Sequence, residues 1–277
     1  MMSKRILIVN WGTLGSNYAF EVAKAKGLEI FLATSPHYPP WVGKIVPRER
    51  MIFTNTYDSE KLITDVAAFI HKKKIHFEAV TTFFEMNIVQ TADLAYLLGY
   101  PFVSPRSARK TSGNKLLMRI ACEEKSIPTP RFMVFNKKKD GFAALKKIGV
   151  PAVLKPVKSG HSFGTLFIDK VDKNTFYKLL KRAKDQLDSN ADEWMRYYNL
   201  YKKDFLIEEY VEGPVLSVDG LVQDKRVMIC GISKFDMSPT PLFIQEAVTI
   251  PADLKQTTKE ECFKYPQKVV SALELDN

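Results

Sequence analysis

A lysine followed by a loop of glycine and serine residues is the most informative stretch of the sequence. Lys155 ends an apolar run, and the residues after it include Ser159, Gly160, Ser162 and Gly164. Glycines let backbone N–H groups approach an anion closely, serine hydroxyls add donors, and lysine supplies a positive charge for phosphate. The pattern predicts a loop that closes over a triphosphate. It does not match a Walker loop, because the lysine precedes the glycines, and a β-hairpin with a surface lysine is the structural alternative.

A second candidate is an apolar segment that runs into acidic residues. Residues 205–207 are apolar, Glu208 and Glu209 follow, and Gly213 ends the segment. An extended segment of this kind can offer backbone N–H and C=O groups to the edge of an adenine ring. An edge strand with a polar turn explains the same pattern equally well.

Cysteine and histidine spacing predicts no metal site. No CxxC pair and no HExxH pattern occurs. We expect the cysteines to be free buried thiols and the histidines to lie on the surface or in loops. These residues are Cys122, Cys230 and Cys262, and His37, His71, His76 and His161.

The formal charge of +10 raises the question of a polyanionic partner. Basic clusters occur at 72–74, 137–139, 178–184 and 202–203. Solvated helix faces and loop tips are the favoured interpretation, since no aromatic residues are interleaved as in a single-strand binding surface. A basic nucleic-acid-binding module is therefore the weaker hypothesis.

No apolar run approaches the roughly 20 residues that span a bilayer, and the N-terminus predicts no secretory signal, so we expect a cytoplasmic protein without a membrane partner.

The N-terminal part has the pattern of an open α/β sheet. Strand and helix patterns alternate, as in βαβ units. The expected elements are strands at 5–10, 28–33 and 79–83 and helices at 17–26, 62–70 and 86–98. Gly12 and Gly15 follow the first strand and could cradle a phosphate at a helix N-terminus. The full GxGxxG pattern is missing, so a tight structural turn is the favoured interpretation.

Strand patterns dominate the remaining part of the chain. One helix is expected within 105–126, with Leu116, Leu117 and Ile120 on its apolar face. The other expected elements are strands at 132–135, 152–155, 165–168, 205–211, 216–222 and 227–233 and helices at 141–147, 173–187 and 193–201. The turn at 223–225 predicts a hairpin between the last two strands.

Several short motifs follow one another in a characteristic order. They lie at 114–119 with 127–130, 154–164, 206–213, 217–222 and 251–254. In sequence and order they resemble the ATP-grasp superfamily, specifically its carboxylate–amine ligases. Each motif is degenerate by itself, and the order carries the resemblance.

The resemblance implies an α/β fold with two domains. A pre-ATP-grasp, Rossmann-like parallel-sheet domain would occupy 1–105, and an incomplete ATP-grasp α+β domain would occupy 106–277. The second domain would contain a linker helix at 106–127, a lid subdomain at about 128–207 and the start of the large subdomain at 208–277.

The resemblance also implies how ATP would be held. Ten residues would contact or approach the phosphates, close over them, or hold adenine. In these three groups they are Lys115, Lys155 and Lys234; Ser159, Gly160, Ser162 and Gly164; and Glu208 with the backbone of Glu209 and Val211. The implied reaction transfers the γ-phosphoryl group of ATP to a small carboxylate, and an amine then attacks the acyl phosphate.

Two departures from the family pattern affect this prediction. Val215 stands where the family usually has a glutamate that binds the ribose. The family ligands for Mg²⁺ would follow Asn277, so Mg²⁺ is expected for the family but its ligands are not in this sequence. We therefore expect a fragment, or a site completed by a C-terminal partner chain; a homodimer is the alternative partner. A catalytically silent nucleotide-binding or regulatory protein is the alternative function.

Overall fold

The computed structural model describes residues 4–160, 162–189, 204–238 and 243–275. The chain divides into two compact units, Met1–Ser112 and Gly113–Asp276. In the described ranges, no helix combines the length and the apolar composition that crossing a membrane requires. The subdomain boundaries expected from the sequence stay a prediction.

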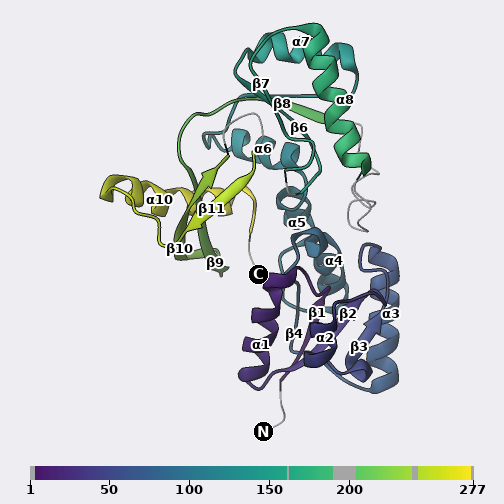
Figure 1. Cartoon of the computed structure of the whole chain (residues 1–277). Coiled ribbons are helices and arrows are strands. Elements are labelled where there is room, and N and C mark those ends of the chain that lie inside the picture. Colours follow the sequence, from purple (N-terminus) through teal and green to yellow (C-terminus); the bar gives the residue numbers. More distant parts are fainter. Residues whose placement is uncertain (1–3, 161, 190–203, 239–242, 276–277) are drawn as a thin grey trace. The chain divides into compact units, whose positions relative to one another are not determined.

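The first unit is built on a parallel four-stranded sheet in the order β3-β2-β1-β4 (Figure 1). The strands are β1 (Arg5–Val9), β2 (Glu29–Thr34), β3 (Met51–Phe53) and β4 (Ala79–Thr81). The helices of this unit are α1 (Asn17–Ala25), α2 (Pro40–Ile45), α3 (Ser59–Lys73), α4 (Ile88–Leu98) and α5 (Pro105–Thr111).

Alternate residues of the central strand enter two different cores. Leu7 packs with residues of α3 and α4, whereas Ile8 packs with Phe20 of α1 and Val42 of α2. Successive side chains of a strand point to opposite faces, so helices cover both faces of this sheet. This arrangement confirms the predicted α/β class.

The loop after β1 is held by its own hydrogen bonds. Asn10 has a positive φ of 66°, and its Oδ1 accepts from the Gly12 backbone N–H at 3.1 Å. Its Nδ2 donates to Asn87 Oδ1 at 2.9 Å, and the Thr13 N–H donates to Ser16 Oγ at 3.1 Å. Because these N–H groups are already bonded within the unit, the structure favours the tight turn over a phosphate loop.

The second unit begins with α6 (Lys115–Glu124) and contains an antiparallel sheet in the order β5-β8-β6-β7. Its strands are β5 (Phe132–Phe135), β6 (Ala152–Pro156), β7 (Leu166–Ile168) and β8 (Phe205–Glu209). One face packs against α7 (Lys138–Ile148) and α8 (Lys173–Ser189), with Leu154 and Ile207 in the shared core. Period-two alternation therefore directs Lys155 and Glu208 to the opposite face.

A three-stranded antiparallel sheet in the order β11-β10-β9 forms the rest of this unit. Its strands are β9 (Val215–Gln223), β10 (Arg226–Met237) and β11 (Gln245–Thr249), and α10 (Gln256–Ala272) follows. Asp224 and Lys225 both have positive φ in the β9–β10 turn, as a type I′ hairpin requires. The predicted hairpin is confirmed.

Three expectations from the sequence need correction. The single helix expected within 105–126 is two helices, because Gly113 has a φ of 68° and Asn114 starts a new helix. Leu117 is exposed, and the buried side of α6 carries Cys122 instead. Of the three cysteines expected to be buried, Cys230 is exposed and Cys262 is half-buried. The helix expected at 193–201 lies outside the described residues.

Candidate functional site

Two basic side chains lie on one face of α6. Lys115 is the first helical residue and Arg119 follows four positions later, the spacing that aligns side chains along a helix. Asn114 caps the helix, since its Oδ1 accepts from the Leu117 N–H at 3.1 Å. The Lys115 N–H donates to Val157 O at 3.0 Å and fastens the start of α6 to the segment after β6. Helix capping and this contact together fix the start of α6, and with it the positions of Lys115 and Arg119.

The Lys115 side chain reaches the glycine- and serine-containing loop. Its Nζ donates to the Ser159 carbonyl at 2.7 Å and to Ser159 Oγ at 3.2 Å. Ser159 is buried although it belongs to a loop. The structure therefore brings together two of the residues predicted to bind phosphate, which are 44 positions apart.

Lys155, Glu208 and Arg119 form a buried ionic cluster on the face of the β5-β8-β6-β7 sheet opposite α7 and α8. Lys155 Nζ lies 2.5 Å from Glu208 Oε2. Arg119 binds the same carboxylate with two donors, from Nε to Oε1 at 3.1 Å and from Nη2 to Oε2 at 3.2 Å. The Glu208 side chain is 3% exposed and that of Lys155 is 15% exposed. Glu208 thus has two cationic partners in a largely dry setting.

Burial and charge act on both acid–base groups of this cluster. Burial acts to raise the pKa of Glu208, but the hydrogen bond from Arg119 and the charge of Lys155 outweigh it and hold this pKa below its usual value. Burial lowers the pKa of Lys155, and the Glu208 carboxylate offsets only part of that effect. The carboxylate is therefore ionised at neutral pH, which is the state that binds both cations.

The loop after β6 is tightly packed at its far end. Gly164 has a φ of 72°, and a Cβ at this position would lie 2.8 Å from Pro156 Cγ. The Gly164 N–H donates to Gln186 Oε1 of α8 at 3.1 Å. Ser162 also has a positive φ, of 59°. These contacts fix the end of the loop, just before β7.

The end of β8 carries the other residues predicted to hold adenine. The Glu209 N–H donates to Arg131 O at 3.0 Å, and its carboxylate binds Arg131 Nε at 2.6 Å. Val211 follows the strand and is exposed. The Glu208 side chain, which the resemblance assigns to adenine, instead binds Lys155 and Arg119 in this structure.

Lys234 lies on a different sheet from the ionic cluster. It belongs to β10, and its Nζ lies 3.4 Å from Asp236 Oδ1 two residues further on. That ion pair includes no other residue of the predicted site. A nucleotide role for Lys234 stays a prediction.

The donors present suit phosphate better than they suit a divalent metal. Lys115 and Lys155 are cations from different elements, next to a loop with hydroxyl and amide donors. Among the residues that the structure describes, no group of three His, Cys, Asp or Glu side chains could hold a metal ion. This part of the chain therefore fits a polyphosphate but does not by itself fit Mg²⁺.

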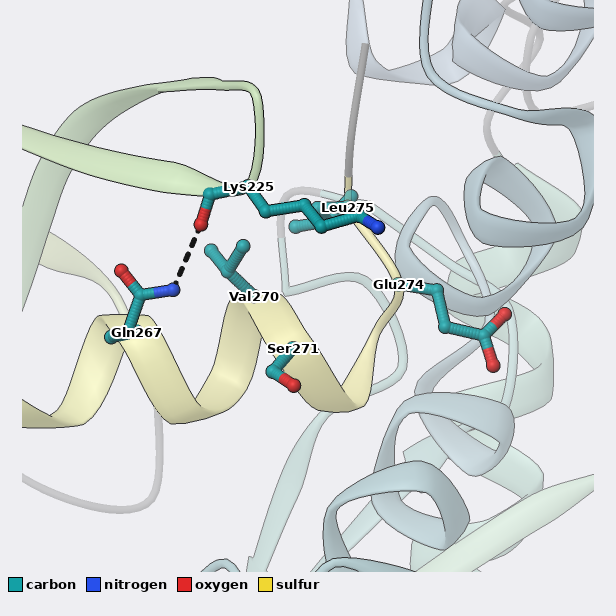
Figure 2. Close-up of a pocket in the computed structure, with 6 residues that line it drawn as sticks. All are labelled: Lys225, Gln267, Val270, Ser271, Glu274 and Leu275. Atoms are coloured by element: carbon teal, nitrogen blue, oxygen red, sulfur yellow. Dashed lines mark hydrogen bonds between the residues drawn. The ribbon is translucent and has the colours of Figure 1, made fainter.

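A separate pocket lies where the β9–β10 turn meets the end of α10 (Figure 2). Its lining residues are Lys225, Gln267, Val270, Ser271, Glu274 and Leu275. Gln267 Nε2 donates to the Lys225 carbonyl at 2.9 Å, so the turn is fastened to the helix. None of these residues was predicted to bind nucleotide.

Arg119 is the site residue that the sequence prediction missed. It lies within a motif that resembles the ligase family, but no role was assigned to it. The signal was present in its spacing, because a residue four positions after Lys115 on a helix shares its face. Only the structure reveals that its partner is Glu208.

Two family models match separate parts of the chain. The ATP-grasp domain matches residues 148–277, and the ATP-grasp N-terminal domain matches residues 20–102. The chain belongs to the ATP-grasp superfamily. This agrees with the resemblance drawn from the ordered sequence motifs.

Individual relatives of this ATP-grasp chain are distant. It is 23% identical to the uncharacterized protein y4rH of Sinorhizobium fredii in an alignment of 277 residues, which covers 99% of this chain and 53% of y4rH. It is 23% identical over 173 residues to the alpha-aminoadipate–LysW ligase LysX of Saccharolobus solfataricus, which is 62% of this chain and 54% of LysX. The chain thus spans about half the length of these two relatives.

A solved structure supports the same fold. The crystal structure of L-amino acid ligase from Bacillus licheniformis matches with a TM-score of 0.80 and 23% identity. The match covers 99% of this chain and 62% of the ligase. At this level of identity the similarity establishes the ATP-grasp fold.

Proposed function

We propose that this chain binds ATP at the site formed by α6, the loop after β6 and the end of β8. Lys115 and Lys155 contact the phosphates, and Lys234 approaches the γ-phosphate. The loop residues Ser159, Gly160, Ser162 and Gly164 close over the phosphates, and Glu208 with the backbone of Glu209 and Val211 holds adenine. Lysine ammonium groups, together with the hydroxyl and backbone N–H donors of the loop, are suited to binding the oxygens of a polyphosphate.

The observation that carries the proposal is the convergence of the two predicted phosphate lysines on predicted site residues. Lys115 binds the loop at Ser159, and Lys155 binds the start of the adenine segment at Glu208. Three separate stretches of sequence thus meet on one side of the β5–β8 sheet. Membership of the ATP-grasp superfamily supports ATP as the ligand.

Isothermal titration of the chain with ATP tests the binding proposal. Each charged hydrogen bond contributes about 1.5–3 kcal/mol. Lys155→Met or Lys115→Met should therefore raise the Kd by about tenfold or more. Lys181→Met is the matched control, because this exposed lysine pairs along its own helix with Asp185, and its Kd should stay within about twofold. Absence of ATP binding by the intact chain would overturn the proposal.

We also infer that nucleotide binding serves carboxylate–amine ligation in the whole protein. The γ-phosphoryl group passes from ATP to a carboxylate oxygen and ADP leaves; the amine nitrogen then attacks the acyl carbon and releases phosphate. LysX and the L-amino acid ligase, both ligases by name, support this class of reaction. The test measures ADP release by the whole protein with Mg²⁺ and mixed amino acids, and compares it with the Lys155→Ala variant of the same protein. Equal rates in the two proteins would count against ligation.

A catalytically silent nucleotide-binding protein is the second candidate. Val215 replaces the family glutamate at the start of β9, and the described residues do not form a metal site. Titration with ATP in the presence and absence of Mg²⁺ separates the two candidates. Equal affinity under both conditions without ADP release would favour the silent protein, whereas Mg²⁺-dependent turnover would eliminate it.

A further inference from the structure

Glu208 binds the lysine that the proposed function assigns to phosphate. Lys155 Nζ and Arg119 Nη2 both contact Glu208 Oε2, at 2.5 and 3.2 Å. A carboxylate with Lys155 as its sole partner would compete with a phosphate for that lysine. Arg119 reduces this competition, because its Nε donates to Glu208 Oε1 at 3.1 Å. Glu208 therefore keeps a cationic partner even when Lys155 leaves it.

The geometry of Arg119 suits a fixed partner better than a mobile one. A guanidinium that binds both oxygens of a carboxylate sets the orientation of that carboxylate as well as its charge. Arg119 is also on the same face of α6 as Lys115, which is anchored to Ser159. Lys155 makes a single-point contact through a flexible side chain, so it is the partner that can leave.

We infer that Arg119 is a positioning residue that holds Glu208, so that Lys155 can transfer from Glu208 to the nucleotide phosphates. The inference rests on the proposed ATP site. Departure of Lys155 leaves a buried carboxylate that is still paired, which avoids the large cost of an unpaired buried charge. It also opens one acceptor position on Glu208 Oε2, next to where adenine is proposed to bind.

The net charge of Lys155, Glu208 and Arg119 predicts how tightly each variant should bind phosphate. The three side chains carry a net charge of +1, which becomes 0 in Arg119→Met and returns to +1 in the double variant Arg119→Met/Glu208→Gln. In Arg119→Met the carboxylate retains Lys155 as its only partner and competes with phosphate. In the double variant Lys155 is released again.

Isothermal titration with sodium tripolyphosphate and with ATP tests this inference. Tripolyphosphate reports on the lysines without the adenine contacts. Arg119→Met should weaken tripolyphosphate binding about tenfold or more, which matches the loss of one charged hydrogen bond. The double variant should return to within about threefold of wild type. Arg119→Lys, which keeps the charge but loses the two-donor geometry, should be intermediate.

Arg131→Met is the matched control for general loss of positive charge. Arg131 binds the adjacent Glu209 at 2.6 Å in a more exposed ion pair, so its variant should bind tripolyphosphate within about twofold of wild type. Unchanged affinity in Arg119→Met, or a double variant as weak as Arg119→Met, would overturn the inference while the ATP site stands. Absence of binding by the intact chain would overturn both. A purely structural role would lower thermal stability without rescue of affinity by Glu208→Gln.

Discussion

At the scale of single residues, the ionisation of Glu208 decides the state of the candidate site. Its carboxylate is buried, and two cations bind it from α6 and β6. Protonation would leave Arg119 and Lys155 beside each other without a counter-charge. The lowered pKa of Glu208 means that this happens only in acid.

Glu208→Gln should therefore change how stability depends on pH. Because the folded pKa is lowered, the carboxylate stabilises the protein above the unfolded pKa, about 4.3, and this stabilisation is lost as pH falls through the folded value. We expect the variant to lose about 1–3 kcal/mol of unfolding free energy near neutral pH. The difference from wild type should shrink in acid.

Urea unfolding at a series of pH values measures this difference. Glu209→Gln is the control, since this neighbouring carboxylate is more exposed and should show a much smaller effect. A difference between Glu208→Gln and wild type that stays constant into acid would contradict the account.

At the scale of elements, α6 carries two cations of the candidate site, Lys115 and Arg119. Its start depends on the Asn114 cap and on the break at Gly113. A shift of this helix would displace Lys115 and Arg119 together. We therefore expect the Asn114 cap to influence nucleotide affinity at the proposed site.

Asn114→Ala should destabilise the protein and also weaken ATP binding. Loss of an N-cap costs about 1 kcal/mol. Because Lys115 is next to the cap and would be displaced, ATP binding should become about threefold to tenfold weaker. Ser104→Ala is the matched control, because Ser104 caps α5 through the Ser107 N–H at 3.1 Å. It should lose similar stability without losing ATP affinity. Equal effects of both variants on the Kd would contradict the link.

The loop after β6 makes a second prediction at this scale. Gly164→Ala combines a left-handed backbone, about 1–2 kcal/mol, with overpacking against Pro156, about 1–3 kcal/mol. Gly27→Ala has a similar φ, of 74°, but no heavy atom within 4 Å of the added Cβ. Chemical denaturation should show a clearly larger loss for Gly164→Ala. Equal losses would mean that close packing does not constrain the loop.

At the scale of the whole molecule, the two units have separate polar and apolar interiors. The polar network around Asn10 lies entirely in the first unit, whereas the ionic cluster around Glu208 lies entirely in the second. We therefore expect a defect in one unit to leave the chemistry of the other largely intact.

Asn10→Ala tests this independence. The variant loses hydrogen bonds to Asn87 and Gly12 and places alanine at a positive φ, which should cost about 2–3 kcal/mol. Its ATP affinity should remain within about twofold of wild type. Thermal unfolding and titration on the same preparation measure both effects. A tenfold loss of affinity would show that the first unit shapes the ATP site.

Sequence alone predicted those parts of the site that depend on local order. Lys155 and Ser159 are close along the chain, and strand alternation assigns Lys155 to one face of its sheet. The contact of Lys155 with Glu208 depends on the antiparallel pairing of β6 with β8, a register that spacing cannot supply. The break before α6 was missed although residues 109–115 include no apolar residue and Gly113 is followed by Asn114, a good helix cap.

A crystal structure of this chain with a non-hydrolysable ATP analogue tests the central claim most directly. The account predicts phosphate oxygens about 3 Å from the Nζ atoms of Lys115 and Lys155, with Arg119 still bound to Glu208. A bound analogue that leaves Lys155 on Glu208 and Lys115 on Ser159, or that occupies another part of the chain, would contradict it.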